Sequence, residues 1–464
     1  MDGLPTPSRY VAMATVICGI ALCVLDGTVM NLALPGIARD MRVSAGEVIW
    51  VVNAYQVAIL ALLLPLAMLG DLFGYRRVYL AGLGLFTVAS LACVVSRTLP
   101  QLVAARTLQG MGAAGMFAIN AALVRIIYPR RLLGRGIAIN SAVVGIASVA
   151  GPSVSALILS VASWPWLFAI NVPLGLGVFA LGLRSLPRQH AGRPAAARLS
   201  PLDVVLNIAM FGLLFLGLDR LVPRGLERPS AGASLAAAAL VAAGIAVGIV
   251  HVRRQRGQVV PLLPIDLLRI PVFRLSMCTS IAAFCAQMLA SIALPFLLLD
   301  GLGRTPADAG VVLSAWPIAT VVVAPLAGRL IGRVGDGLLG GIGLVALGLG
   351  LLALVLLPPE PSLLQLGWRL ALCGAGFGLF QSPNNHTIVT SAPASRSGAA
   401  GGMLGTARLT GQSSGAVLIA MLFSVSASLP QHVPAMALGI AALCAFGASI
   451  TSLLRLRATA LAAA

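Results

Sequence analysis

The stretch YVAMATVICGIALCVLDGTVMNLAL (10–34) decides the fold of this chain. It carries a single charged side chain, Asp26, and it exceeds the roughly 20 apolar residues that cross the hydrocarbon core of a bilayer as a helix. No small-residue cleavage site follows the run, so we expect a retained helix rather than a signal peptide. The first element of the chain therefore belongs in a membrane.

The composition extends this conclusion to the whole chain. Of 464 residues, 59% are hydrophobic and 9% are charged, whereas soluble domains carry roughly 25% charged residues. The length therefore indicates a series of spanning helices rather than three soluble domains. The chain has no lysine, and its 31 arginines give a net charge of +18. These arginines stand in short gaps between apolar runs, so the positive charge does not indicate a nucleic-acid partner.

Fourteen apolar runs are long enough to span a bilayer. They lack the alternation of barrel strands, and an unsatisfied backbone group in lipid is costly, so we expect all of them to be helices in an all-α membrane fold. We place them at residues 10–34, 48–69, 77–97, 102–127, 136–160, 164–184, 203–221, 232–252, 272–299, 307–330, 337–357, 362–390, 399–427 and 434–455.

The arginines predict which side of the membrane each loop occupies. An even number of spans puts both termini on one side. With the N-terminus inside, twenty-one arginines lie on the cytoplasmic side and eight on the other, and Arg106 and Arg408 fall within spans. This excess obeys the positive-inside rule. We therefore predict a multi-pass protein of the inner (plasma) membrane with both termini cytoplasmic.

Two longer polar stretches, 185–202 and 253–271, flank a pair of spans and leave six spans on either side. The stretch PLAGRLIGRVG (325–335) is an altered copy of PLAMLGDLFGYRR (65–77) at the matching place, which supports an internal repeat. Such halves place a substrate cavity near the membrane midplane. The expected domains are an N-terminal six-helix half (1–184), linkers with an inserted helix pair (185–270), and a C-terminal six-helix half (271–464).

Asp26 is the only carboxylate deep within a predicted span, and Arg106 stands in LVAARTLQGMGAA (102–114) with Gln109 on the same helical face. A charge at a helix centre costs roughly 2.5–3.5 kcal/mol on insertion scales and persists where it faces a cavity or a partner. Since desolvation favours the protonated form of a carboxyl, Asp26 suits a proton carrier, and the always-charged Arg106 suits holding it. The alternatives are a structural ion pair or packing contact at Asp26 and a snorkelling side chain at Arg106.

Two further segments are candidates for moving parts. Asp71 with Arg76 and Arg77 forms a candidate cytoplasmic gate, although arginine-rich turns also satisfy topology alone. Gly151 and Pro152 in GIASVAGPS form a candidate pivot because proline bends a helix, and simple close packing is an equal alternative.

Polar side chains within other spans are candidates for lining the substrate cavity. The run GLFQSPNNHTIV (378–389) concentrates amides, for which substrate contact and hydrogen bonding between helices are evenly weighted. His386 in this run is a lone histidine, and we expect no ligand there. The candidates are Asn31, Tyr55, Gln56, Gln287, Gln381 and Asn384.

Other classes of function lack their usual residues. The seven cysteines fall inside apolar runs without metal-ligand spacing, so we expect no disulfide, no metal and no other cofactor. There is no phosphate-binding glycine-rich loop, no HExxH motif and no acid pair at hydrolytic spacing, and the four histidines are scattered. We expect a transporter rather than an enzyme; a non-transporting receptor or a membrane-embedded enzyme is the remote alternative.

Taken together, these motifs resemble the major facilitator superfamily, and within it the fourteen-helix drug:proton antiporters, over nearly the whole chain. LDGTVMNLALP (25–35) is similar to the first-helix signature of that family, LVAARTLQGMGAA to its helix-four motif, and WPWLFAINVPLG (164–175) to its helix-six motif. QSPNNHTIV, followed by GAAGGMLGTARLTGQSSGA (398–416), resembles a late-half signature that includes Arg408. The resemblance covers both halves of the predicted fold.

The resemblance implies proton-coupled efflux of hydrophobic or amphipathic compounds, such as drugs and antiseptics, by alternating access. It implies that Asp26 and Arg106 couple protons and that the loop carrying Asp71 gates the cytoplasmic side. The departures from the family pattern lie in the gate loop, in its second-half copy and in the fifth helix; they are Ala67, Leu72, Tyr75, Gly332, Ser155 and Ala156.

A dedicated exporter of one endogenous metabolite or antibiotic is the first alternative, and an uptake symporter is the second. The expected partners are a small-molecule substrate, protons and the lipid bilayer, without nucleic acid. A monomer is the default for this architecture.

Overall fold

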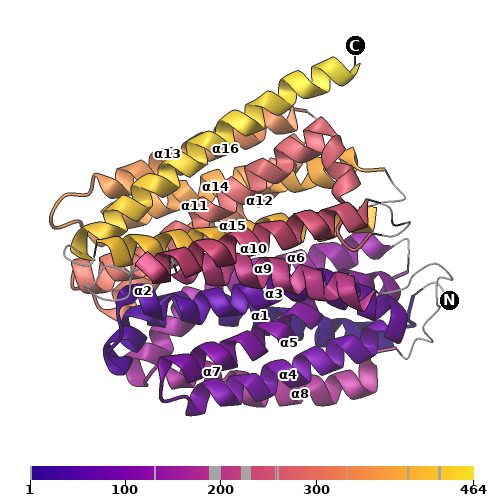
Figure 1. Cartoon of the computed structure of the whole chain (residues 1–464), viewed down its shortest axis with the longest axis horizontal. Coiled ribbons are helices and arrows are strands. Elements are labelled where there is room, and N and C mark those ends of the chain that lie inside the picture. Colours follow the sequence, from indigo (N-terminus) through magenta and orange to yellow (C-terminus); the bar gives the residue numbers. More distant parts are fainter. Residues whose placement is uncertain are drawn as a thin grey trace. The chain divides into compact units, whose positions relative to one another are not determined.

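In a computed structural model, the chain consists of long α-helices (Figure 1). The structure describes residues 3–463 apart from 130–131, 188–199, 221–230, 257, 259–260, 332, 394–396 and 427–429. Within these residues, 13 helices are long and apolar enough to cross a membrane. The predicted all-α fold of spanning helices is confirmed.

The helices follow one another with short connections. The first part of the chain forms α1 (Ser8–Met41), α2 (Ala45–Val48), α3 (Trp50–Phe73), α4 (Tyr75–Val95), α5 (Leu99–Ile127), α6 (Leu133–Val161), α7 (Pro165–Ala169) and α8 (Asn171–Ser185). A helix pair follows, α9 (Pro201–Arg220) and α10 (Ala231–Gln255). The last part forms η2 (Ile265–Arg269), α11 (Pro271–Phe296), the π-helical turn η3 (Leu297–Gly301), α12 (Pro306–Leu330), α13 (Asp336–Val355), α14 (Leu363–Ser391), α15 (Ser397–Val425), η5 (Pro430–His432) and α16 (Val433–Ala463).

Each predicted span coincides with a helical segment. The predicted span 399–427 corresponds to α15, which is 29 residues long but is not among the 13 most apolar helices. Its polar side chains include Arg408 and Gln412. The last helix differs from its prediction, because α16 continues to Ala463 instead of ending at residue 455. Arg455, counted with the loop arginines, therefore lies within a helix and is 2% exposed.

Local sequence signals set the helix ends. At the start of α14, the Ser362 hydroxyl accepts a hydrogen bond from the Gln365 backbone N–H, and the Gln365 side chain accepts one from the Ser362 N–H. This reciprocal capping box satisfies two backbone donors that the helix leaves open. Between α3 and α4, Gly74 adopts φ +94°, a conformation that glycine takes without strain. That residue permits the tight reversal between α3 and α4.

Backbone contacts divide the chain into two compact units. The first comprises Met1–Val43, Trp50–Gly217 and Ala239–Leu262, and the second comprises Ser44–Ile49, Leu218–Ala238 and Leu263–Ala464. In the first unit, α5 packs between α3 and α4, α4 also packs against α8, and α1 packs against α6 (Figure 1). In the second unit, α14 packs against α12 and α13, and α11 packs against α15 and α16.

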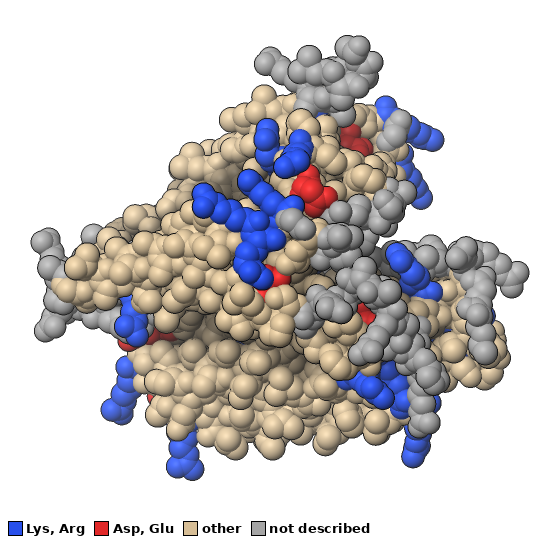
Figure 2. All heavy atoms as spheres, turned by 45° about the vertical axis from the view of Figure 1, so that its right-hand side comes forward, with Lys and Arg blue, Asp and Glu red and all other residues tan. Residues whose placement is uncertain are grey.

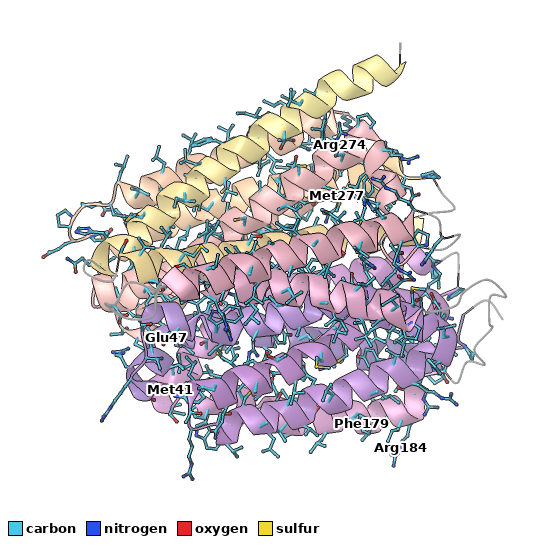
Figure 3. The ribbon with its side chains drawn as sticks, in the orientation of Figure 1. Met41, Glu47, Phe179, Arg184, Arg274 and Met277 are labelled. Carbon is cyan, nitrogen blue, oxygen red and sulfur yellow. The ribbon has the colours of Figure 1, made fainter. Side chains whose placement is uncertain are left out.

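The two ends of the first unit are visible in Figure 3. Met41, at the end of α1, lies at the opposite end of the unit from Arg184, near the end of α8. Consecutive spans therefore carry the chain back and forth, as the predicted topology requires. Figure 2 shows arginines in groups separated by broad uncharged areas. Large apolar side chains such as Val161 and Leu364, 83% and 80% exposed, lie on the surface, as lipid contact requires.

Helix α5 is held unusually close to its neighbours. A Cβ at Gly110 would overlap the backbone of Tyr55 in α3, and a Cβ at Gly112 would lie 2.5 Å from the backbone nitrogen of Phe86 in α4. Small residues allow such backbone approach between membrane helices. The approach falls one to two turns after Arg106, so the side chains on this part of α5 are enclosed.

Candidate functional site: a buried carboxylate network

Asp26 lies in α1 of the first unit and is 4% exposed. Its Oδ2 accepts a hydrogen bond from Arg106 Nη1 at 2.5 Å, which forms an ion pair. Its Oδ1 accepts hydrogen bonds from Gln109 Nε2 at 2.9 Å and from Asn171 Nδ2 at 2.8 Å. The carboxylate thus has three donors from two other helices, which stabilise the charged form away from water.

Arg106 is fully buried and its contacts fix its orientation. Its Nη1 also donates to Gln109 Oε1 at 2.6 Å, and its Nε donates to the carbonyl of Val51 in α3 at 3.0 Å. The guanidinium carbon lies 4.2 Å from the ring centroid of Tyr55 and 5.6 Å from that of Phe168. Such cation–π contacts favour a cation that has lost its hydration. The predicted pairing partner of Asp26 is therefore in place, and a snorkelling Arg106 is ruled out by its burial.

The network extends to residues that the sequence did not single out. Asn171, 3% exposed, begins α8, and Ser90, fully buried in α4, accepts a hydrogen bond from Gln109 Nε2 at 2.9 Å. Asn171 lies 145 residues from Asp26 in the chain, so only the fold brings them together. The sequence offered only a weak indication of this contact, because Asn171 and Ser90 are uncharged polar residues in largely apolar runs.

This arrangement can store or release one charge. While Asp26 is ionised, the buried pair is neutral overall, and Nε and Nη1 of Arg106 both donate to oxygen atoms. Protonation of Asp26 would leave the Arg106 charge uncompensated in a low dielectric, which is costly unless another anion or water reaches it. The charge of Asp26 is therefore held by hydrogen bonds that join α1 to α5 and α8.

The loop between α3 and α4 holds the predicted gate residues. Asp71 is exposed, and its Oδ1 accepts a hydrogen bond from the Tyr75 hydroxyl at 2.5 Å. Arg76 donates to the carbonyl of Leu183 in α8, and Arg77 is exposed. Among the described residues, no ion pair within 4.0 Å joins Asp71 to either arginine. In this structure the three residues lie together on one loop without forming a salt-bridge latch.

The candidate pivot in α6 packs tightly against α1. A Cβ at Gly151 would overlap the hydroxyl of Thr28, and Ser155 Oγ donates to the carbonyl of Val29 at 2.9 Å. Pro152 lies inside the helix. Ser155, one of the departures from the family pattern, therefore makes a hydrogen bond that a glycine could not make.

The six predicted cavity residues are distributed over both units. In the first unit, Tyr55 donates to the carbonyl of Cys23 at 3.3 Å and is 4% exposed. Asn31 is partly exposed, and its carbonyl oxygen has no hydrogen-bond partner within the described part of the chain. Gln56, in α3, is 9% exposed. Tyr55 thus belongs to the carboxylate network through its ring.

The remaining candidates lie in the second unit. Gln287 and Gln381 are partly exposed. Asn384 is fully buried: its Nδ2 donates to Ser280 Oγ at 2.7 Å, and its Oδ1 accepts from Arg455 Nη1 at 2.7 Å. These bonds join α14 to α11 and α16, so Asn384 holds helices together in this conformation. Arg455 was not predicted as part of any network.

The sequence comparisons decide the family. A family model described as the Major Facilitator Superfamily matches residues 16–416. The chain belongs to this superfamily. It is therefore a multi-pass membrane transporter with a small-molecule substrate, and not an enzyme, as the sequence predicted.

Members of the superfamily resemble the chain over nearly its whole length. An uncharacterized transporter of Escherichia coli, YebQ, is 51% identical over 453 residues, which cover 97% of each chain. The multidrug efflux pump LfrA of Mycolicibacterium smegmatis is 30% identical, with 94% of this chain and 86% of the pump covered. The peptide transporter POT shares the fold, with a TM-score of 0.71, 14% identity and coverage of 95% and 93% of the two chains.

Proposed function

We propose that this transporter exports hydrophobic or amphipathic compounds from the bacterial cytoplasm in exchange for protons, as a fourteen-helix drug:proton antiporter of the inner membrane. The observation that carries the proposal is the Asp26 carboxylate, buried in a spanning helix and held by Arg106, Gln109 and Asn171. Ionisable side chains inside the membrane mark proton relays and substrate pathways, and protonation of a carboxylate there removes one negative charge. Similarity to a multidrug efflux pump supports the export of toxic compounds.

In the proposed cycle, a proton from the periplasm neutralises Asp26 and weakens substrate binding. The emptied carrier returns to its inward-open state and releases the proton to the cytoplasm. Halves 1–184 and 271–464 alternate access, with 185–270 as an inserted segment and both termini cytoplasmic. We assign gating to the loop of Asp71, Arg76 and Arg77 and bending to Gly151 and Pro152. The proposed cavity residues are Asn31, Tyr55, Gln56, Gln287, Gln381 and Asn384.

Coupling is tested in everted membrane vesicles with an imposed pH gradient. The transported probe is the toxic amphipathic compound to which expression of the protein gives the strongest resistance in an efflux-deficient host. Asp26→Asn should abolish gradient-driven transport and retain substrate–substrate exchange, which needs no proton. Glu360→Gln, at an exposed loop carboxylate, is the matched control and should transport normally. Undiminished gradient-driven transport by Asp26→Asn would refute the assignment.

The same system separates the alternatives. Resistance to many unrelated compounds supports multidrug export, whereas resistance to a single compound indicates a dedicated exporter. Uptake rather than export of the probe under the same pH gradient would indicate a symporter.

A further inference from the structure

Arg408 is a second arginine in the middle of a long core helix, α15. The face of α15 that carries Arg408 packs against α11, because Gly411 and Gly415, three and seven residues later, both approach the α11 backbone. A Cβ at Gly415 would lie 2.6 Å from the carbonyl of Cys285. The Arg408 guanidinium lies 5.5 Å from the ring centroid of Phe284. The side chain therefore points into the helices of the second unit.

The positive charge of Arg106 is balanced by Asp26, whereas no described carboxylate balances the charge of Arg408. Arg106 pairs with Asp26 and donates to two further oxygens. Within the described part of the chain, Arg408 forms no ion pair within 4.0 Å and donates no hydrogen bond, and its ring contact with Phe284 is its one charge-compensating interaction. A cation–π contact is a weak attraction and satisfies none of the five guanidinium donors. Arginines within spanning segments otherwise pair or face a pathway.

Two amides with similar properties accompany Arg408. Gln412 follows one turn later on α15, and Gln287 lies one turn after Phe284 on α11. All three residues are partly exposed in the structure. Neither amide is hydrogen-bonded to the described residues, and each can both donate and accept. The three side chains offer a cation flanked by adaptable hydrogen-bonding groups.

We propose that Arg408 binds the anionic group of the transported molecule, with Gln287 and Gln412 as flanking contacts. This substrate class rests on the proposed export function and narrows it to amphipathic anions such as carboxylates, sulfonates and phenolates. The intramembrane carboxylate of Asp26 is already paired with Arg106 and is therefore not free to bind a cationic substrate. In this proposal, the anionic group of the substrate is the counter-ion of Arg408.

The test is equilibrium binding of two probes of equal size and opposite charge, tetraphenylborate and tetraphenylphosphonium, to the purified full chain in detergent. The wild type should bind the borate more tightly. Arg408→Gln should weaken borate binding by about tenfold or more, since it removes the positive charge that attracts the anion, and should not weaken phosphonium binding. Arg408→Lys keeps the charge and should retain part of the preference.

Arg369→Gln is the matched control. Arg369 also lies in a spanning helix of the second unit and contacts a ring, that of Trp368 at 4.6 Å, but its donors are occupied by the carbonyls of Ala353 and Gln365. Its replacement should leave both affinities unchanged. No borate binding by the wild type, a preference for the phosphonium, or an equal loss for both probes in Arg408→Gln and Arg408→Lys would overturn the proposal. Binding needs no proton gradient, so this outcome is independent of whether export is proton-driven.

Discussion

The buried pair of Asp26 and Arg106 predicts a non-additive response to mutation. Asp26→Asn leaves a guanidinium with 0% exposure without its counter-ion, and Arg106→Gln leaves the carboxylate with the amide donors of Gln109 and Asn171 alone. Removing one partner of a buried ion pair costs about 3–5 kcal/mol, because an uncompensated charge stays in a low dielectric. We expect each single variant to lose unfolding free energy on this scale.

The double variant Asp26→Asn/Arg106→Gln removes both charges and keeps side chains that can share hydrogen bonds. We expect its loss of unfolding free energy to be smaller than the sum of the single losses by about 2 kcal/mol, in the range found for contacting residues. The assay is chemical unfolding of the purified proteins in detergent, followed by tryptophan fluorescence.

A second pair serves as the control for this cycle. Asp203 and Arg254 lie 3.1 Å apart, but the Arg254 side chain is 42% exposed. Water screens such a pair, so the same double-mutant cycle with Asp203→Asn and Arg254→Gln should give a coupling of about 1 kcal/mol or less. Additive losses for Asp26 and Arg106 would refute the reasoning that their buried charges compensate one another.

Two further substitutions probe the surroundings of the network. Asn171→Ala removes a donor to a buried carboxylate and should lower the unfolding free energy by about 1.5–3 kcal/mol in the same titration; a loss within about 0.5 kcal/mol would show that its hydrogen bond is dispensable. Gly112→Ala forces a methyl group against the Phe86 backbone and should cost about 1–3 kcal/mol. Gly177→Ala, where no atom lies within 4 Å of the added methyl, should be neutral by comparison. Equal behaviour of the two glycine variants in size-exclusion and unfolding measurements would contradict the close packing of α5.

The spanning helices were predictable because lipid imposes one requirement on every segment. A run that is apolar and about 20 residues long must be a helix, whatever its neighbours are. The end of α16 was not predictable in this way. Arg455 would normally mark the end of a span, but it lies buried in α16, where it donates hydrogen bonds to Asn384 and Ser276 from other helices. Those acceptors are distant in the chain.

The carboxylate network was predictable only in part, for a related reason. A charge within an apolar run is conspicuous, so Asp26 and Arg106 could be singled out, and helical spacing added Gln109. Asn171 and Ser90 are neutral, and their importance depends on which helix faces which. The hydrogen bond from the Tyr75 hydroxyl to the Asp71 carboxylate was not predicted either, because it depends on how the chain reverses at Gly74.

One consequence follows from how many helices meet at a single carboxylate. Asp26 on α1 receives donors from α5 and α8, and Gln109 continues the chain of bonds to Ser90 on α4. Movement of α1 or α5 would break several of these hydrogen bonds at once, and movement of α8 would break the bond from Asn171. We therefore expect the first unit to move between distinct arrangements rather than through a continuum of intermediates, with the proposed protonation of Asp26 as the trigger.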